Sequence, residues 1–302
     1  MDSPAYDATI RAVPPALAER ARRLAAGEIV PPAPRHASTV VLLRDGVQGL
    51  EVYVLRRRTT MAFAAGMYAF PGGAVDARDV EDGAAEGAGS AAWAGPSPAE
   101  WADRLGFADA GIARASVCAA VRETFEESGV LLAGPSPDSV VADTTGDDWE
   151  RDRMALLGRV VSFGEVLARR GLVLRSDLVA PWDHWVTPRV EERRFDTRFF
   201  LAALPAGQHT RDVAGEADRV AWMRPSEALA SVERGEMRML PPTYLTLASL
   251  ADFPDVKTAL TAAAGRSISP IMPTVTFDGE QARWALPGDA GGEDAYDEGI
   301  VR

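Results

Sequence analysis

The feature that most constrains this chain is a set of three glutamates at fixed spacing, in the run Arg-Glu-Thr-Phe-Glu-Glu-Ser-Gly-Val at 122–130. Residues three and four apart share one face of an α-helix, so the carboxylates of Glu123, Glu126 and Glu127 converge. Gly129 is typical of the position just past a helix end. An apolar stripe lies on roughly the opposite side, formed by Val117, Val121 and Phe125. We therefore predict a helix that buries its apolar stripe and leaves the acids accessible.

Such a cluster of acids needs a compensating charge. Like charges at these helical spacings repel by about 0.2–0.5 kcal/mol per pair in water, and by more where water is partly excluded. A hard, oxygen-binding cation such as Mg²⁺ would relieve this repulsion, and Arg122 can orient or neutralise one carboxylate. The alternative, for this spacing taken alone, is a solvated acidic face of a helix.

The flanking residues give the cluster a family resemblance. The segment 122–130 resembles the second half of the Nudix box, G-x5-E-x7-R-E-U-x-E-E-x-G-U with U apolar, although Thr124 occupies one U position. The box normally opens with Pro-Gly-Gly, which Phe-Pro-Gly-Gly at 70–73 supplies, and Asp79 stands where the box has its first glutamate. Gly73 and Arg122 lie much further apart than the box allows. The sequence is therefore similar to a Nudix box interrupted by an insertion at about 77–108.

An interrupted box is a feature of the peroxisomal-type acyl-coenzyme A diphosphatases within the Nudix family. Further motifs resemble that subfamily, namely F-P-G-G-x-x-D at 70–76, W-V-T-P at 185–188, R-R-F-D-T-R-F-F at 193–200 and L-P-P-T at 240–243. The resemblance implies an α/β Nudix fold, a mixed β-sheet sandwiched between helices, with a helical and loop insertion and a C-terminal extension. We expect an N-terminal arm at 1–35, a Nudix domain at 36–250 and an extension at 251–302 that ends in a disordered acidic tail.

The resemblance also implies a metal-dependent diphosphate hydrolase. Mg²⁺ or Mn²⁺ would be held by Glu123, Glu126 and Glu127, with a backbone carbonyl at Gly73, while Arg122 orients a glutamate. The general base is either Glu123 or Glu216. The expected substrate is coenzyme A or an acyl-CoA, which would give 3′,5′-ADP and (acyl-)phosphopantetheine. The alternatives are another dinucleotide or nucleotide sugar, such as ADP-ribose or NADH, and a non-catalytic Nudix-fold module that binds a nucleotide.

Several residues are candidates for binding the substrate. Gly72 and Gly73 allow the backbone to approach a ligand closely. Arg194 and Arg198 share one face of a predicted strand with Arg189 nearby, and together they form a candidate phosphate clamp. The alternative for the clamp is a strand on which arginines pair with Asp196. Three other groups of side chains each have two interpretations. Arg56 to Arg58 form either a phosphate contact or a solvated strand end, and Trp182 or Trp185 either stacks on adenine or belongs to the core. His184 is either a general base or a structural histidine.

Composition limits the remaining possibilities. The net charge of −12 argues against nucleic acid as the main partner, and an apolar content of 47% is ample for a core. The single cysteine, Cys118, excludes an internal disulfide and is read as a packing residue in a reducing compartment. We find no secretory signal, no run long enough to span a membrane and no peroxisomal tripeptide, and expect a cytoplasmic protein. A homodimer is retained as a candidate assembly, although the sequence does not reveal the oligomeric state.

Local patterns predict the elements around the box. We expect a helix at 15–26, one that begins after Asp109, one that begins at Pro225 and one that follows Pro241 and Pro242 and runs through 250. We also expect a hairpin of 38–43 with 50–57, and strands at 130–132, 193–201 and 220–222. A single long helix is expected at 147–170, with approximate core positions Trp149, Met154, Leu157, Val160, Val161 and Leu167. Short β-like runs are expected at 269–286. Within the insertion, 81–95 is predicted to be a flexible loop and Ser97 to begin a helix packed through Trp101, Leu105 and Phe107. The insertion is either a lid or decoration.

Overall fold

The structure is a computed structural model, and it describes residues 11–59, 64–84, 92–211, 217–287 and 289. Its centre is an eight-stranded mixed sheet in the order β10-β2-β1-β9-β8-β11, with β3 beside β2 and β4 beside β1. Strand β1 pairs in parallel with β9, and β8 with β11, whereas the other pairs are antiparallel. The strands of this sheet are β1 (Arg35–Gly46), β2 (Gly49–Arg57), β3 (Tyr68–Ala69), β4 (Gly72–Ala74), β8 (Val179–Val186), β9 (Phe195–Ala203), β10 (Ala217–Met223) and β11 (Pro270–Ile271).

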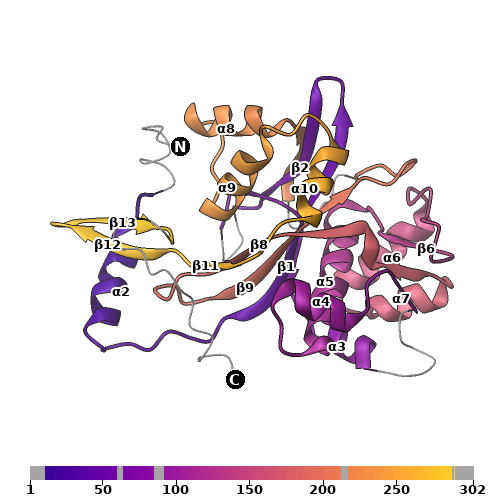
Figure 1. Cartoon of the computed structure of the whole chain (residues 1–302), viewed down its shortest axis with the longest axis horizontal. Coiled ribbons are helices and arrows are strands. Elements are labelled where there is room, and N and C mark those ends of the chain that lie inside the picture. Colours follow the sequence, from indigo (N-terminus) through magenta and orange to yellow (C-terminus); the bar gives the residue numbers. More distant parts are fainter. Residues whose placement is uncertain (1–10, 60–63, 85–91, 212–216, 288, 290–302) are drawn as a thin grey trace.

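Helices cover the sheet on both faces (Figure 1). They are α2 (Pro15–Ala25), α3 (Ala77–Ala84), α4 (Pro98–Leu105), α5 (Ala110–Ser128), α6 (Asp147–Leu157), α7 (Phe163–Arg169), the 3₁₀ turn η1 (Ser176–Leu178), α8 (Pro225–Glu233), α9 (Pro241–Leu250) and α10 (Val256–Ala264). Two small sheets accompany them, one of β5 (Ala92–Ala94), β7 (Val173–Arg175) and β6 (Ala133–Gly134), the other of β12 (Thr274–Asp278) and β13 (Gln281–Ala285).

The two layers follow from the alternation of side chains along the strands. In β1, Val40 and Leu42 face the core that contains α4, α5 and α7, whereas Val41 and Leu43 face the core that contains α8, α9 and α10. The sheet is therefore buried on both sides, as the resemblance implies. Helix α10 lies beyond position 250, yet its apolar residues join the second core, so this part of the C-terminal extension belongs to the main body.

Local signals located most elements correctly. The predicted hairpin is β1 and β2, in register from Leu43 opposite Val52 to Gly46 opposite Gly49. Asp109 caps α5 by accepting the amide N–H of Ile112 at 2.9 Å. The helix that begins after Ser97 is confirmed as α4, with a complete capping box. The expected strand from 193 and the expected helices after 225 and at 241 are also present.

Two predicted elements are wrong. Residues 130–132 are buried but form no strand, because the side-chain amide of Gln208 bonds to both the backbone N–H and the carbonyl of Leu131. The expected long helix at 147–170 is two helices, α6 and α7. The chain breaks between them at Gly158 and Arg159, whose φ is +55°, and Ser162 then caps α7. Met154 and Val160, predicted as core positions, are exposed.

The insertion is part of the core rather than an appendage. Trp101 on α4 is fully buried and packs edge to face against Phe200 of β9, with 6.0 Å between the ring centroids. Strand β5 pairs with β7, and Ser176 donates its hydroxyl to the carbonyl of Ala94 at 2.7 Å. Of the predicted flexible loop, 85–91 lie outside the described residues, while 81–84 belong to helix α3. Helix α4 fills the core beside α5, so this part of the insertion is not decoration, and the lid stays a prediction.

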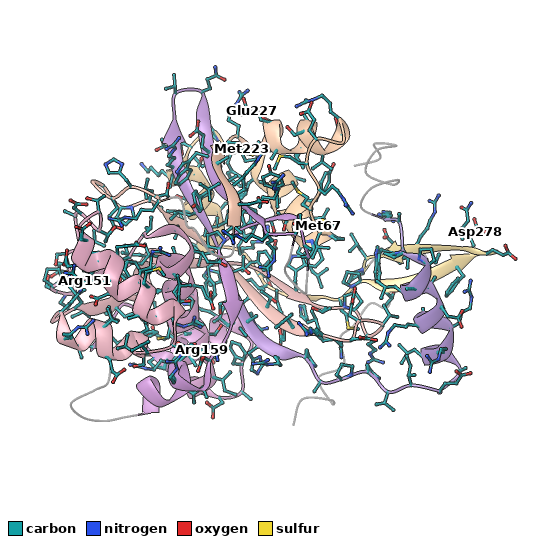
Figure 2. All side chains as sticks on the ribbon, turned by 180° about the vertical axis from the view of Figure 1, so that it is seen from behind. Met67, Arg151, Arg159, Met223, Glu227 and Asp278 are labelled. Carbon is teal, nitrogen blue, oxygen red and sulfur yellow. The ribbon has the colours of Figure 1, made fainter. Side chains whose placement is uncertain are left out.

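A smaller lobe lies to one side of the body, where α2 meets the hairpin of β12 and β13 (Figure 1). Figure 2 shows Asp278, at the tip of this hairpin, at the opposite end of the molecule from Arg151 on α6. Arg22 of α2 lies over the ring of Phe277 at 4.9 Å. Among the described residues, no helix has both the length and the apolar character needed to cross a membrane.

Candidate active site

Helix α5 presents its acids as the spacing predicts. Val117, Val121 and Phe125 are buried in the core against β1, and Gly129 ends the helix with a φ of +75°. Thr124, the departure from the apolar pattern, is fully buried and donates its hydroxyl to the carbonyl of Ala120 at 2.7 Å, so its polar group is satisfied within the helix. The acidic side is less accessible than expected, since only 8% of Glu126 and 3% of Glu127 are exposed.

Strand β4 brings the Phe-Pro-Gly-Gly segment against these acids. The amide N–H of Gly72 donates to Glu127 Oε2 at 2.8 Å. At Gly73, a Cβ atom would lie 2.3 Å from Glu123 Oε1, closer than any side chain allows. A side chain at position 73 would therefore displace the carboxylate of Glu123, and both glycines contact the glutamate cluster.

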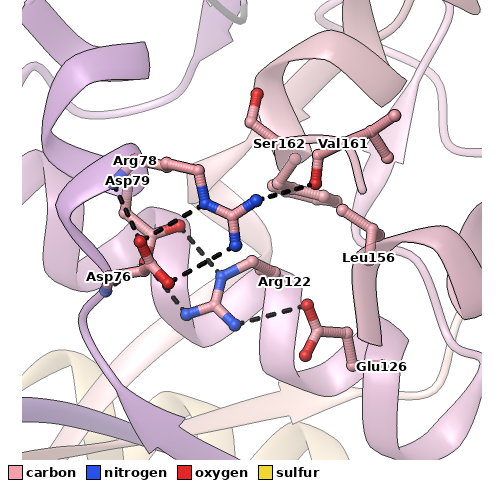
Figure 3. Close-up of a pocket in the computed structure, with 9 residues that line it drawn as sticks. Asp76, Arg78, Asp79, Arg122, Glu126, Leu156, Val161 and Ser162 are labelled. Atoms are coloured by element: carbon pink, nitrogen blue, oxygen red, sulfur yellow. Dashed lines mark hydrogen bonds and ion pairs between the residues drawn. The ribbon is translucent and has the colours of Figure 1, made fainter. Parts of the chain in front are cut away.

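Arg122 joins the acids from the two halves of the motif (Figure 3). Its Nε and Nη2 donate to the two carboxylate oxygens of Asp79, both at 2.9 Å. Its Nη1 donates to Glu123 Oε1 at 2.8 Å and to Glu126 Oε1 at 3.3 Å, and Nη2 also reaches the carbonyl of Ala74 at 3.1 Å. Asp79 is 1% exposed. The two halves separated by the insertion thus meet at one guanidinium.

The buried charges shift one another's pKa values. Burial raises the pKa of Glu123 to about 7; the charge of Arg122 opposes this effect, and that of Glu126 adds to it. Burial acts to lower the pKa of Arg122, but the surrounding carboxylates of Glu123, Asp79 and Glu126 outweigh it and raise the pKa above its usual value. The cluster therefore holds more negative charge than Arg122 balances.

Comparison with known proteins identifies this arrangement. The family model of the NUDT19 Nudix domain matches residues 109–250. The crystal structure of a Nudix hydrolase from Alicyclobacillus acidocaldarius is 30% identical in sequence, with a TM-score of 0.61. The similarity covers 76% of this chain and 96% of that one. The chain belongs to the Nudix hydrolase family. Its resemblance at the split box and the expected α/β fold are both confirmed.

Within the Nudix family, the chain is similar in sequence to acyl-coenzyme A diphosphatases. The acyl-coenzyme A diphosphatase NUDT19 of Xenopus laevis is 27% identical over 275 residues, which are 82% of this chain and 72% of the relative. The human protein of the same name is 27% identical over 282 residues, which are 80% of this chain and 72% of the relative. The similarity thus extends well beyond the box.

The Nudix box carboxylates match a divalent cation in chemical type. Glu123, Glu126 and Glu127 are hard oxygen donors of the kind that Mg²⁺ and Mn²⁺ prefer, and the excess negative charge on the cluster favours a cation. Among the described residues, no three acidic, histidine or cysteine side chains are already arranged as a metal site. Arg122 contacts Glu123 and Glu126, and the amide of Gly72 contacts Glu127.

The predicted phosphate clamp on β9 is not formed. Arg194 and Arg198 are 4% and 3% exposed. Arg194 donates to the carbonyls of Thr187 at 3.0 Å and Pro32 at 2.9 Å. Arg198 donates to the carbonyl of Leu105 at 2.9 Å. Both guanidiniums therefore hold the fold together, because a buried charge must be paired where it lies.

The other predicted substrate contacts have mixed outcomes. Trp185 is 4% exposed and packs in the core that faces α9 and α10, so its face is not available to an adenine. His184 is buried and pairs with Asp196, the carboxylate that Arg198 also contacts, which supports its structural reading. Arg189 is half-buried. Glu216, the alternative general base, lies outside the described residues.

Sequence reasoning missed two residues that support the cluster. Arg153 on α6 is 3% exposed and donates Nη1 to the backbone carbonyl of Glu126 at 2.8 Å. Its spacing of three from Glu150, with which it pairs, was the available signal. Asp76 lies at the start of α3, beside Asp79. It is the last residue of the F-P-G-G-x-x-D motif, whose role had not been assigned.

Proposed function

We propose that the protein hydrolyses the diphosphate of coenzyme A or an acyl-CoA, to give 3′,5′-ADP and (acyl-)phosphopantetheine. The observation that carries this substrate is the similarity to acyl-coenzyme A diphosphatases over 72% of their length. All three glutamates of the box are retained and gathered beside β4, which favours an active hydrolase over a binding module. The arrangement of the box alone does not distinguish CoA from other nucleoside diphosphates.

The chain's own residues have distinct tasks in this reaction. Glu123, Glu126 and Glu127 would hold Mg²⁺ or Mn²⁺. When bound, such an ion neutralises charge on the diphosphate and lowers the pKa of the attacking water. Arg122 orients Glu123 and Glu126, and it contacts no substrate in this role. Gly72 and Gly73 let β4 lie directly against the carboxylates. A carboxylate, Glu123 or Glu216, accepts the proton of the water.

Product analysis by mass spectrometry tests this proposal. The purified protein would be incubated with Mg²⁺ or Mn²⁺ and a panel of CoA, several acyl-CoAs, ADP-ribose, NADH and diadenosine polyphosphates. We expect release of 3′,5′-ADP from the CoA species, and a loss of about 100-fold or more in the Glu126→Gln, Glu127→Gln double variant. Glu233→Gln, an exposed glutamate at the end of α8, is the matched control and should keep full activity.

Each other outcome has a defined meaning. Cleavage of ADP-ribose, NADH or a diadenosine polyphosphate without cleavage of CoA would retain the Nudix chemistry and reject the CoA assignment. Binding of a panel member without metal-dependent cleavage of any would favour the nucleotide-binding module. Equal activity of the double variant and the wild type would show that Glu126 and Glu127 are not needed for the reaction.

A further inference from the structure

Asp76 begins helix α3 with two local hydrogen bonds. Its Oδ1 accepts the amide N–H of Arg78 at 3.0 Å, and its own amide N–H donates to Asp79 Oδ2 at 2.8 Å. Asp76 is therefore the N-cap of α3, and Asp79, the third helical residue, bonds back to the N-cap amide as the third residue of a capping box does. The hydrogen bond from Arg78 holds the pKa of Asp76 below its usual range. The start of α3 is thus fixed by Asp76 and Asp79 together.

The carboxylate of Asp79 serves the catalytic helix at the same time. Its Oδ2 accepts from both the amide of Asp76 and Arg122 Nη2, while its Oδ1 accepts from Arg122 Nε. Figure 3 shows Asp76 and Asp79 on one side of the Arg122 guanidinium and Glu126 on the other. The planar fork of Arg122 has one orientation when its Nε and Nη2 are held by one carboxylate. The orientation of Asp79 therefore sets the direction of Nη1, which contacts Glu123 and Glu126.

Asp76 is itself held in place by the turn between α6 and α7. Arg78 donates to the carbonyl of Val161 at 3.2 Å and to that of Arg159 at 3.4 Å, and its Nε lies 3.4 Å from Asp76 Oδ1. The side chain of Arg159 also lies 3.6 Å from Asp76 Oδ2. Contacts from α3 and from this turn therefore converge on Asp76, although it touches none of the box glutamates.

We propose that Asp76 is a positioning residue for Nudix hydrolysis, because it caps α3 and thereby orients Asp79, Arg122 and the carboxylates of Glu123 and Glu126. The kinetic part of this inference rests on the proposed function, whereas the structural part does not. The carboxylate of Asp79 reaches the Asp76 amide and Arg122 together.

The test compares three variants. Asp76→Ala removes the cap, Asp76→Asn keeps an acceptor for the Arg78 amide, and Asp255→Ala removes an equivalent cap from α10, where Asp255 accepts the amide of Thr258 at 2.7 Å. Each would be measured for thermal unfolding, for kcat and KM on the substrate that the wild type cleaves, and for exchange of the Arg122 Nε proton by ¹⁵N NMR. The NMR signal is assigned by its loss in Arg122→Lys.

The expected results separate positioning from general stability. Asp76→Ala should lower kcat by about 10- to 100-fold with little change in KM, and should accelerate exchange of the Arg122 Nε proton at least about tenfold. Asp76→Asn should restore both, and Asp255→Ala should lower the unfolding temperature without affecting either. Unchanged exchange in a folded Asp76→Ala would overturn the proposal, as would an equal loss of kcat in Asp255→Ala. If the wild type cleaves no panel member, the proposed function fails and the exchange rates alone decide.

Discussion

At the scale of single residues, the main feature of the site is that several carboxylates share the positive charge of Arg122. Glu123 lies against Gly73 and shares one guanidinium with Glu126 and Asp79. Burial raises the pKa of Glu123 to about 7, from a usual value of 4.5. The folded protein therefore holds this proton to higher pH than the unfolded chain does.

This difference predicts how the metal-free protein responds to pH. The stabilising contribution of protonated Glu123 is fully present below the unfolded pKa of 4.5 and is lost as the pH rises through about 7. A shift of this size corresponds to up to about 3 kcal/mol in the free energy of unfolding. Urea unfolding in EDTA at pH 5.5 and pH 8 should show the larger part of this loss, about 2 kcal/mol, in the wild type.

The control is Glu123→Gln, which carries no titrating group at this position. Its free energy of unfolding should change less between the two pH values. Because a divalent cation favours the ionised carboxylate, adding Mg²⁺ at pH 8 should stabilise the wild type more than the variant. A constant difference between the two proteins across this pH range would contradict the prediction.

At the scale of elements, strand β4 and helix α5 are separate in sequence but fit together through two glycines. Gly72 and Gly73 are neighbours, yet they face different partners. A Cβ atom at Gly72 would lie 2.5 Å from the backbone carbonyl oxygen of Ser38, whereas one at Gly73 would meet the flexible carboxylate of Glu123. The two positions should therefore respond differently to the same substitution.

We predict that Gly72→Ala destabilises the fold and that Gly73→Ala chiefly reduces activity. The rigid backbone of β1 cannot move away from position 72, so we expect a loss of about 1–3 kcal/mol in the free energy of unfolding. Glu123 can rotate away from position 73, so that variant should unfold near the wild-type temperature with a kcat about 10- to 100-fold lower. Calorimetry and steady-state kinetics on both variants check this contrast, and equal effects in the two would refute it.

At the scale of the whole molecule, the insertion has become part of the core. Helix α4 packs beside α5, which carries the box glutamates, and α3 carries the aspartate that meets Arg122. The insertion thus adds side chains to the core that contains α4, α5 and α7, and the two halves of the box still contact each other. Helix α10 extends the second core in the same way from the C-terminal side.

The integration of the insertion is testable at Trp101, which is fully buried between α4 and β9. Trp101→Ala should reduce the free energy of unfolding by about 3–5 kcal/mol, because it leaves a cavity in the core. Val160→Ala is the control; Val160 is 77% exposed, and its truncation should change stability by no more than about 0.5 kcal/mol. Chemical denaturation measures both. A Trp101→Ala protein as stable as the wild type would show that α4 is dispensable to the core.

Local sequence patterns were enough to predict the features whose causes are local. The apolar stripe and the acidic side of α5, the caps at Asp109 and Ser97, and the hairpin of β1 and β2 depend on residues a few positions apart. The same is true of each half of the box motif, and these halves carried the resemblance to the Nudix family. Helix periodicity alone could not locate the break between α6 and α7, because an apolar run continues across a turn that Arg159 makes with a positive φ.

Tertiary structure decided which groups each buried charge meets. Asp79 and Arg122 are 43 positions apart, and their pairing depends on how the insertion folds. Arg194 and Arg198 had the spacing of a clamp, but the partners that bury them come from the linker before β1 and from the end of α4. Spacing along a chain states which side chains share a face, whereas burial of a charge is set by distant segments that supply its partners. This is why the glutamates and Arg122 could be found from the sequence, whereas the contacts of Asp76 and Arg153 could not.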